Sequence, residues 1–372
     1  MEKPTKYMMV IDKIKEWIDN GDIKPGEKIY SENEMAKMFN VSRHTIRQAV
    51  GELVHEGLLY REQGAGTFCS STPKSKNNIS DQTNVEKLRG KNIGIITTYI
   101  SDYIFPSIIR GMESYLSSKD YSLILASTDN DIEKEKQCLE AMLKRNIDGL
   151  IIEPTKSSSY NPNMHYYLEL EQKNIPYLMI NQFYSQLQPP HIILNDEKGG
   201  FIATEHLIKN GHEKIIGIFK TDDLQGVYRM KGFIRAFRQN QIPFFNEMMI
   251  SYSTEDLDHV LKEKLENLFA DTNNLPTGIV CYNDTIALLV INILREKGIN
   301  VPDDVSVVGY DDSYLSEASE IKLTSITHPK MQMGIDAAKW IVSTIENNNN
   351  NEQTSIIYEA ELVIRNSTKK IN

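Results

Sequence analysis

The sequence predicts an α/β protein in two parts: a small helical module that ends in a β-hairpin, and a larger module of doubly wound, mainly parallel sheets. Three short helical patterns precede the hairpin. After residue 90, apolar strands alternate with amphipathic helices, which is typical of stacked βαβ units. Residues 71–90 are polar and lack helical or strand periodicity, so we expect domains at 1–70 and 91–372 joined by a linker.

The composition predicts a soluble cytoplasmic protein with no membrane partner. No apolar run is long enough to cross a bilayer, and no signal-like leader follows Met1. Cys69, Cys138 and Cys281 lie far apart and form no metal-binding or redox motif, so we expect neither a metal nor a cofactor. Because the formal net charge is -10, any contact with nucleic acid must be concentrated on one element.

The first two helices of the small module are predicted from periodicity and capping. Val10, Ile14, Trp17 and Ile18 recur at helical spacing, and Gly21 ends that helix. A capping box then starts the second helix, whose apolar side chains should face inward. The box is Ser31 with Glu34, and the apolar residues are Met35, Met38 and Phe39.

The third helix is predicted to present a polar and cationic face. Ser42 can cap it, while Ile46, Val50, Leu53 and Val54 form its buried stripe. Arg43, His44, Arg47 and Gln48 then face outward. Arg43 and Arg47 lie one turn apart, so both can enter one major groove, where arginine pairs with guanine. Taken alone, such a face is more often simply solvated.

The segment LLYREQGAGTFC predicts a hairpin beside this helix. Gly64 and Gly66 permit positive φ and a close approach of the backbone to a phosphate or a minor groove. A hairpin in this position is the wing of a winged helix-turn-helix. The small module therefore has the parts of a DNA-binding domain.

The small module resembles the GntR family in GDIKPGEKI, SENEMA, VSRHTIRQAVGELVHEGLL and GAGTF, in that order. Tyr30 departs from the family, which usually has proline before the capping residue. The resemblance implies contacts with operator DNA. The implied DNA-binding residues are Glu32, Ser42, Arg43, Thr45, Arg47 and Gly64, with Lys6, His44 and Gln63 as weaker additions.

In the larger module, the residues that follow the predicted strands are candidates for a ligand site, because ligands of parallel sheets bind beyond the carboxyl ends of strands. The predicted strands are 92–98, 122–127, 149–152, 177–180, 192–194, 214–219, 278–281 and 305–310. The strand-end candidates are carboxylates, amides, an arginine and aromatic side chains, which suit the hydroxyls and C–H faces of a sugar. Asn181, Asp196 and Asn283 could equally cap turns or helices.

Residues 91–368 resemble the sensor domain of the LacI/GalR family, in NIGII, GGFIATEHLIKNGHEKIIGI, RMKGF, YNDTIALLVINILREKGINVPDDVSVVGYDDS and LVIRNST among other segments. The resemblance implies a periplasmic-binding-protein-like fold of two lobes, three strand crossovers and an effector cleft between the lobes. Arg229 and Asp284 are the first implied sugar ligands. The further implied residues are Tyr99, Phe105, Glu153, Asn181, Tyr282, Asp311 and His328.

The pairing of a GntR-type module with a LacI/GalR-type sensor is similar to that of bacterial arabinose repressors. It implies a homodimer that releases operator DNA when L-arabinose binds. A corepressor-type regulator remains an alternative, because the ligands do not determine the sign of the coupling. A sugar hydrolase that uses Glu153 and Asp284 as acid and base is another alternative. The absence of nucleotide, zincin or esterase motifs speaks against an enzyme, and the first 70 residues speak against an exported solute-binding protein.

Overall fold

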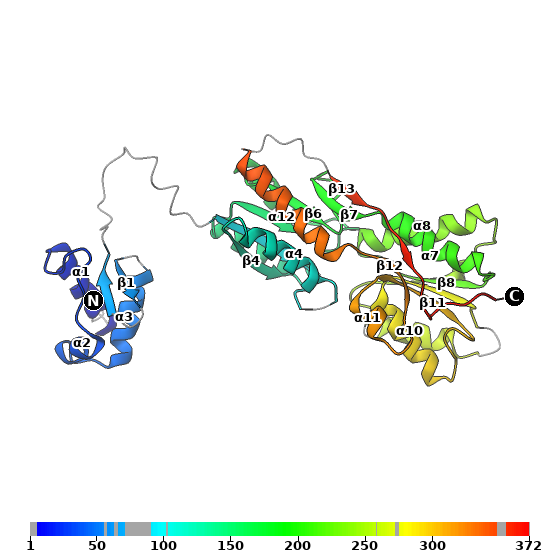
Figure 1. Cartoon of the computed structure of the whole chain (residues 1–372), viewed down its shortest axis with the longest axis horizontal. Helices are drawn as coiled ribbons and strands as arrows, with labels where there is room; N and C mark the ends of the chain where they lie inside the picture. The colour runs from blue at the N-terminus through cyan, green and yellow to red at the C-terminus, as the bar shows by residue number, and fades with distance from the viewer. Residues whose placement is uncertain are drawn as a thin grey trace. The chain divides into compact units, whose positions relative to one another are not determined.

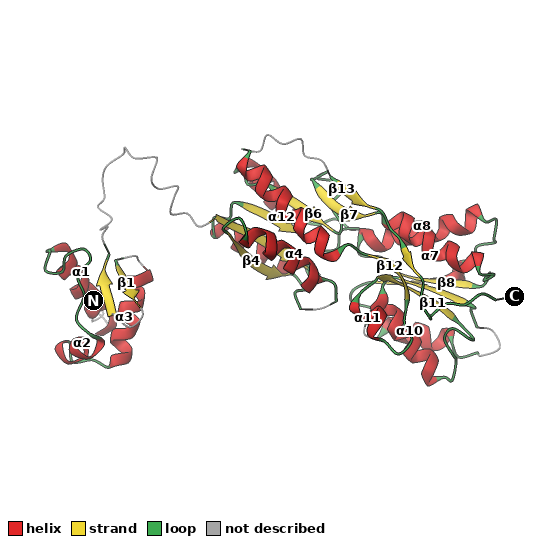
Figure 2. Ribbon diagram, in the orientation of Figure 1, coloured by secondary structure: helices red, strands yellow, loops and turns green. Residues whose placement is uncertain are grey.

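The structure is a computed structural model that describes residues 6–55, 58–62, 66–70, 91–101, 103–257, 259–271, 275–347 and 355–371. It divides into two compact units, Met1–Glu86 and Lys87–Asn372. The division falls within the segment that the sequence predicts as a linker, residues 71–90, which lies outside the described residues. Figures 1 and 2 show the elements of each unit.

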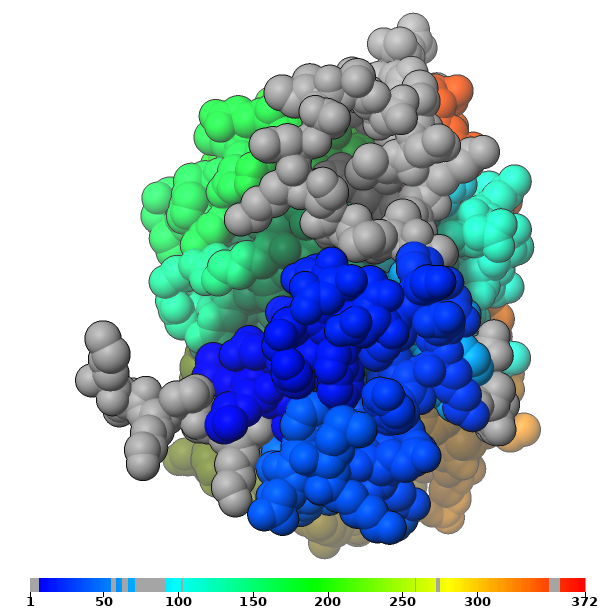
Figure 3. Space-filling model, turned by 90° about the vertical axis from the view of Figure 1, so that its left-hand side faces the viewer, coloured from blue at the N-terminus to red at the C-terminus, as the bar shows by residue number. Residues whose placement is uncertain are grey.

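In the described residues, the first unit is a three-helix module with a two-stranded antiparallel hairpin. Figure 3 shows its surface, in blue, in a space-filling view. Its elements are α1 (Lys6–Asp19), α2 (Glu32–Met38), α3 (Arg43–His55), β1 (Leu59–Glu62) and β2 (Gly66–Cys69). Ile14, Ile46 and Leu53 are among the buried side chains at its centre. The hairpin pairs Leu59 with Cys69, and both side chains are buried in this core. The predicted winged helix is confirmed in the described residues.

Local capping places the helices of this unit as predicted, with one error. The Ser31 side chain and Glu34 make both hydrogen bonds of the capping box. Met35 is 1% exposed, but Met38 is 51% exposed, so the prediction that Met38 faces the core is wrong. Met38 is the last residue of α2, where the chain turns away, and its side chain therefore stays on the surface.

The second unit has two lobes, each built on a six-stranded sheet. The first sheet has the order β13-β7-β6-β5-β3-β4, and all of its pairs are parallel. The second has the order β14-β12-β11-β10-β8-β9, in which only the pair of β12 and β14 is antiparallel. The prediction of mainly parallel sheets is confirmed.

The strands of the first lobe are β3 (Lys91–Thr97), β4 (Tyr121–Ser127), β5 (Gly149–Ile152), β6 (Tyr177–Ile180), β7 (His191–Leu194) and β13 (Ile356–Tyr358). Its helices are α4 (Phe105–Ser117), α5 (Ile132–Lys144), α6 (Met164–Gln172) and α12 (Lys330–Glu346). Every residue of β5 is buried, because helices cover both faces of the sheet. Figure 1 shows α12, in orange, beside α4 in cyan, although the two helices lie far apart in the sequence.

The strands of the second lobe are β8 (Ile215–Lys220), β9 (Met249–Tyr252), β10 (Gly278–Cys281), β11 (Ser306–Asp311), β12 (Thr324–Thr327) and β14 (Leu362–Val363). Its helices are α7 (Asp196–Lys209), α8 (Leu224–Gln239), α9 (Val260–Leu268), α10 (Asp284–Glu296) and α11 (Tyr314–Ala318), with a short 3₁₀ turn at Asn246–Met248. The chain passes between the two sheets after β7, after β12 and again after β13. This agrees with the three expected crossovers.

All eight predicted strands are present, with boundaries that differ by one residue or less. The sequence analysis missed β9, β12, β13 and β14. Three of these are edge strands of two to four residues. The fourth, β12, has the sequence TSIT, and its serine and threonines do not look like those of a buried strand. The predicted surface loop at Asn347–Asn351 lies outside the described residues except for Asn347, which follows α12.

We expect Gly111→Ala to destabilise the first lobe by several kcal/mol. A Cβ on Gly111 of α4 would lie 2.2 Å from the carbonyl oxygen of Met331, and backbone atoms cannot move aside cheaply. Gly51→Ala on α3 is the control, because nothing lies within 4 Å of its Cβ position and alanine favours helix. Chemical denaturation followed by circular dichroism measures both variants. An unchanged midpoint for Gly111→Ala would contradict this account of the α4–α12 contact.

Candidate functional site

The first unit presents the predicted cationic face on α3. Arg43, His44 and Arg47 are all exposed there. The Glu32 carboxylate on α2 accepts hydrogen bonds from Arg47 Nε at 3.3 Å and Arg47 Nη2 at 3.0 Å. Arg61 of β1 lies 3.9 Å from the same carboxylate. Glu32 therefore orients the Arg47 guanidinium and links α2, α3 and the hairpin.

The start of α3 can accept an anion. Ser42 Oγ accepts a hydrogen bond from the Thr45 amide at 3.1 Å and lies 2.8 Å from Thr45 Oγ1. The amides of a helix N-terminus point outward and attract phosphate oxygens. Among the other predicted DNA-binding residues, Lys6 begins α1, and Gln63 and Gly64 lie outside the described residues.

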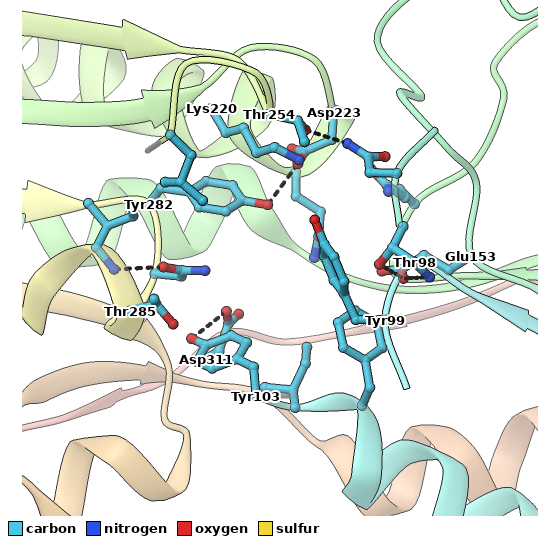
Figure 4. A pocket seen from close by; sticks show the side chains of 18 of the residues that line it. Thr98, Tyr99, Tyr103, Glu153, Lys220, Asp223, Thr254, Tyr282, Thr285 and Asp311 are labelled. Atoms are coloured by element: carbon cyan, nitrogen blue, oxygen red, sulfur yellow. Dashed lines mark hydrogen bonds and ion pairs between the residues drawn. The ribbon is translucent and has the colours of Figure 1, made fainter. Parts of the chain in front are cut away.

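The second unit contains a cavity of about 340 Å³ between its two lobes, at the carboxyl ends of the strands (Figure 4). Both lobes contribute through the loops that follow their strands. The first lobe provides Thr98, Tyr99, Tyr103, Ile104, Phe105, Asn130, Glu153 and Gln182. The second lobe provides Lys220, Asp223, Gln225, Tyr252, Thr254, Leu257, Tyr282, Asn283, Thr285, Ile286 and Asp311.

Five of the nine predicted effector-binding residues line this cavity: Tyr99, Phe105, Glu153, Tyr282 and Asp311. The rings of Tyr99 and Phe105 meet edge to face at 5.8 Å and form an apolar corner. The Tyr282 hydroxyl donates to Asp223 at 2.8 Å. The cavity therefore combines aromatic surface with carboxylates, as the sequence analysis expected of the site.

Arg229, one of the two first-ranked ligands, lies behind the cavity wall and is 1% exposed. Its Nε donates to Asp196 at 2.8 Å, its Nη1 to the Tyr282 carbonyl at 2.7 Å and its Nη2 to Asp311 at 3.1 Å. The Tyr310 ring lies 3.6 Å from the guanidinium carbon. Arg229 therefore supports cavity residues and does not itself line the cavity, so its direct contact with a ligand stays a prediction.

Asp284, the other first-ranked ligand, is also behind the wall. Its carboxylate accepts hydrogen bonds from the amide and hydroxyl of Ser313, at 2.7 and 2.8 Å, and from the Ser325 hydroxyl at 2.6 Å. Burial raises the pKa of Asp284 to about 7. A carboxylate engaged in this way fastens the start of α10 to Ser313, which follows β11, and to Ser325 of β12. Its contact with a ligand stays a prediction.

Asn181 and His328 also stand behind the lining, next to Glu153. Asn181 Nδ2 donates to Glu153 at 2.8 Å, and Asn181 Oδ1 lies 3.1 Å from His328 Nε2. Burial lowers the pKa of His328 to about 4, so its ring is neutral at pH 7. The two residues therefore orient Glu153, and neither lines the cavity.

Several lining residues were missed by the sequence analysis, among them Tyr103, Asn130, Lys220, Asp223 and Thr254. Lys220 ends β8 and directly follows the predicted strand 214–219, but it was not chosen as a candidate. Thr254 follows β9, which was itself missed. Tyr103 and Asn130 lie several residues into loops, where no periodic pattern marks them.

The electrostatics of the cavity favour a neutral ligand. Three carboxylates, Glu153, Asp223 and Asp311, belong to the lining, against the single ammonium of Lys220 among the described residues. That ammonium lies 3.1 Å from Asp223 and is already paired. Asp311 is likewise paired, with Arg229 at 3.1 Å, so neither cation is available to an anionic ligand, whereas hydroxyl groups can donate to the carboxylates.

The described residues contain no cluster of three or more His, Cys, Asp or Glu side chains arranged to hold a metal. Among the helices that the structure describes, none combines the length and apolar character needed to span a bilayer.

Residues 6–69 match the family of bacterial regulatory proteins named gntR, and residues 204–368 match the periplasmic binding protein-like domain family. The chain is 52% identical to an arabinose metabolism transcriptional repressor of Halalkalibacterium halodurans, over 98% of this chain and 96% of the relative. It is 49% identical to the repressor of the same name from Geobacillus stearothermophilus, over 98% of each. A LacI family regulator of Enterococcus faecium with bound ribose is similar in structure, with a TM-score of 0.64, 26% identity and coverage of 76% of this chain and all of that one.

We expect the stability of the second unit to depend on the protonation of Asp284. Its raised pKa means that the folded state holds the proton more tightly than the unfolded chain. Stability from this group is therefore full below about pH 4 and is lost as the pH rises through about 7. Relative to Asp284→Asn, the wild-type free energy of unfolding should fall by up to about 1.4 kcal/mol per pH unit between these values.

Urea denaturation of wild type and Asp284→Asn from pH 4 to pH 8 measures the difference in unfolding free energy between them. The contributions of the other titrating groups are the same in both proteins and cancel in this difference. Asp303→Asn is the matched control, because that side chain is 78% exposed. A wild-type-to-variant difference that is independent of pH would refute the raised pKa.

Proposed function

The chain belongs to the family of arabinose metabolism transcriptional repressors, and we propose that L-arabinose binds in the cavity of its second unit and releases operator DNA. The chain is a DNA-binding repressor that joins a GntR-type module to a sugar-binding sensor of the periplasmic-binding-like type. The observation that carries the effector proposal is the cavity itself, which lies between two lobes and is lined by carboxylates, amides and aromatic rings. We place the DNA-binding domain at 1–70, the linker at 71–90 and the sensor at 91–372.

A pentose matches the chemistry of the lining. Each sugar hydroxyl can donate to Glu153, Asp223 or Asp311 and can accept from an amide or from Lys220. The apolar corner of Tyr99 and Phe105 can pack against C–H groups. A phosphorylated sugar is disfavoured because the ammonium of Lys220 and the guanidinium of Arg229 are already paired with Asp223 and Asp311. Arg229, Asp284, Asn181 and His328 act in this proposal by holding the lining residues in place.

Two α3 helices of a homodimer would occupy successive half-sites on the operator. Arg47, oriented by Glu32, and Arg43 are the base-reading residues. Ser42 and Thr45 at the helix start, with His44, Lys6 and the wing residues Gln63 and Gly64, would contact the backbone. In this proposal the two arginines provide sequence preference, and the other residues provide affinity for DNA of any sequence.

We propose that binding of the sugar weakens binding of operator DNA. A sugar that prefers one arrangement of the lobes shifts the dimer away from the spacing that DNA requires, by about 1 to 3 kcal/mol in typical systems. DNA must then weaken sugar binding by the same factor. A positive coupling would instead identify a corepressor.

We expect Arg47→Ala to reduce sequence discrimination by about 1 to 3 kcal/mol, because a bidentate pair with guanine is lost. The probe is a duplex selected from random sequence by the wild-type protein, compared with a scrambled duplex in a gel-shift titration. Lys13→Ala is the control, since Lys13 is exposed on α1 and pairs with Glu16. Equal losses on both duplexes would show that Arg47 contacts only phosphate.

We expect calorimetry to show binding of L-arabinose that is tighter than that of D-xylose, D-ribose or D-galactose. Asp311→Asn should weaken it by about tenfold or more, because a hydrogen bond to a charged group is lost. Asp303→Asn, at an exposed position, should bind as wild type does. If no L-arabinose binds to the wild type, the effector assignment fails while the DNA-binding function stands.

A further inference from the structure

Tyr103 reaches from the first lobe into the second at the floor of the cavity. It lies in the loop between β3 and α4 and lines the cavity. Its hydroxyl is 2.8 Å from Asp311 Oδ2 and 2.8 Å from the Tyr310 carbonyl oxygen, and it accepts a hydrogen bond from the Asp284 amide at 3.1 Å. One phenol oxygen thus joins the two lobes at the end of β11 and the start of α10 (Figure 4).

The backbone on both sides of this contact is held in an unfavourable conformation. Tyr103 has φ of 61° and Asp311 has φ of 84°, and the next residue, Asp312, has φ of 41°. Residues with a Cβ avoid positive φ unless their surroundings enforce it, and such positions concentrate where function requires them. Two of these residues meet each other across the cavity through the Tyr103 hydroxyl.

Asp311 is oriented from two directions. Arg229 donates to Oδ1 at 3.1 Å from within the second lobe, while Tyr103 reaches Oδ2 from the first lobe. The Lys330 ammonium donates to the Asp311 carbonyl at 2.7 Å and secures its backbone. Removing the Tyr103 hydroxyl would leave one carboxylate oxygen free to turn, although Asp311 itself remains in the cavity wall.

The lobes have other contacts on the far side of the cavity, so the loss of one hydroxyl should act locally. Asn130 Nδ2 donates to Thr254 Oγ1 at 2.6 Å, and the Leu224 amide donates to Ser157 Oγ at 2.9 Å. These contacts keep the lobes together without Tyr103. A Tyr103→Phe variant therefore changes the cavity floor and not the fold of either lobe.

We propose that Tyr103 is a positioning residue of the effector site, whose hydroxyl orients the Asp311 carboxylate and ties the first lobe to the start of α10 before ligand arrives. The proposal rests on the proposed function in taking this cavity as the effector site. In this role the Tyr103 hydroxyl responds both to a ligand in the cavity and to a change in the arrangement of the lobes.

The first test uses the full chain without ligand. Hydrogen exchange of the Asp284 amide should be several-fold faster in Tyr103→Phe than in wild type, because the amide loses its acceptor. Tyr177→Phe is the matched control, since its hydroxyl bonds to the Glu171 carboxylate within the first lobe, at 2.8 Å. Exchange at Asp284 that is unchanged in Tyr103→Phe would overturn the proposal.

The second test is a double-mutant cycle on L-arabinose affinity with Tyr103→Phe and Asp311→Asn. Tyr103→Phe should weaken binding by about tenfold, and the double variant should bind no more weakly than Asp311→Asn alone, because Tyr103 acts through Asp311. Additive losses would mean that Tyr103 contacts the sugar independently, which overturns the positioning role. If the wild type binds no sugar, the effector assignment fails, and the exchange result alone decides the role of Tyr103.

Discussion

The buried ion pairs of Arg229 are the interaction on which the sensor depends most. One guanidinium joins Asp196, the first residue of α7, to Asp311 at the end of β11 and to the carbonyl after β10. Burial raises the pKa of Asp196 to about 6 in spite of the adjacent arginine. A buried charge that loses its partners costs several kcal/mol, so each member of this cluster constrains the others.

This cluster explains how a cavity between two lobes can keep a defined shape. Strand ends are normally joined only by mobile loops, but here three of them share one cation. The Asp311 side chain and the Tyr282 backbone, which border the cavity, are consequently held in place. Recognition of a small polyol requires such rigidity, because every unpaired hydroxyl in a desolvated site weakens binding.

Most of the fold could be predicted from the sequence because it depends on local patterns. Apolar runs such as GLII identify strands that are buried on both faces, and capping boxes identify helix starts. The edge strands could not be predicted in the same way. A segment of two or three residues, such as Leu362–Val363, becomes a strand only because a neighbouring strand offers it hydrogen bonds.

The candidate site could be predicted only in outline. Strand-end placement identified Glu153, Tyr282 and Asp311, which line the cavity. It could not distinguish a side chain that points into the cavity from one that supports the wall, as Arg229 and Asp284 do. That difference depends on which partners the folded chain brings within hydrogen-bond distance, and no sequence pattern records it.

The path of the chain between the lobes has a consequence for synthesis on the ribosome. The first lobe is completed by α12 and β13, which come after nearly all of the second lobe. Its sheet edge and the α4 surface therefore stay uncovered until translation is almost finished. The DNA-binding module emerges first, and its core is built from residues of its own unit. A nascent chain thus acquires the means to bind DNA before it acquires the means to respond to a sugar.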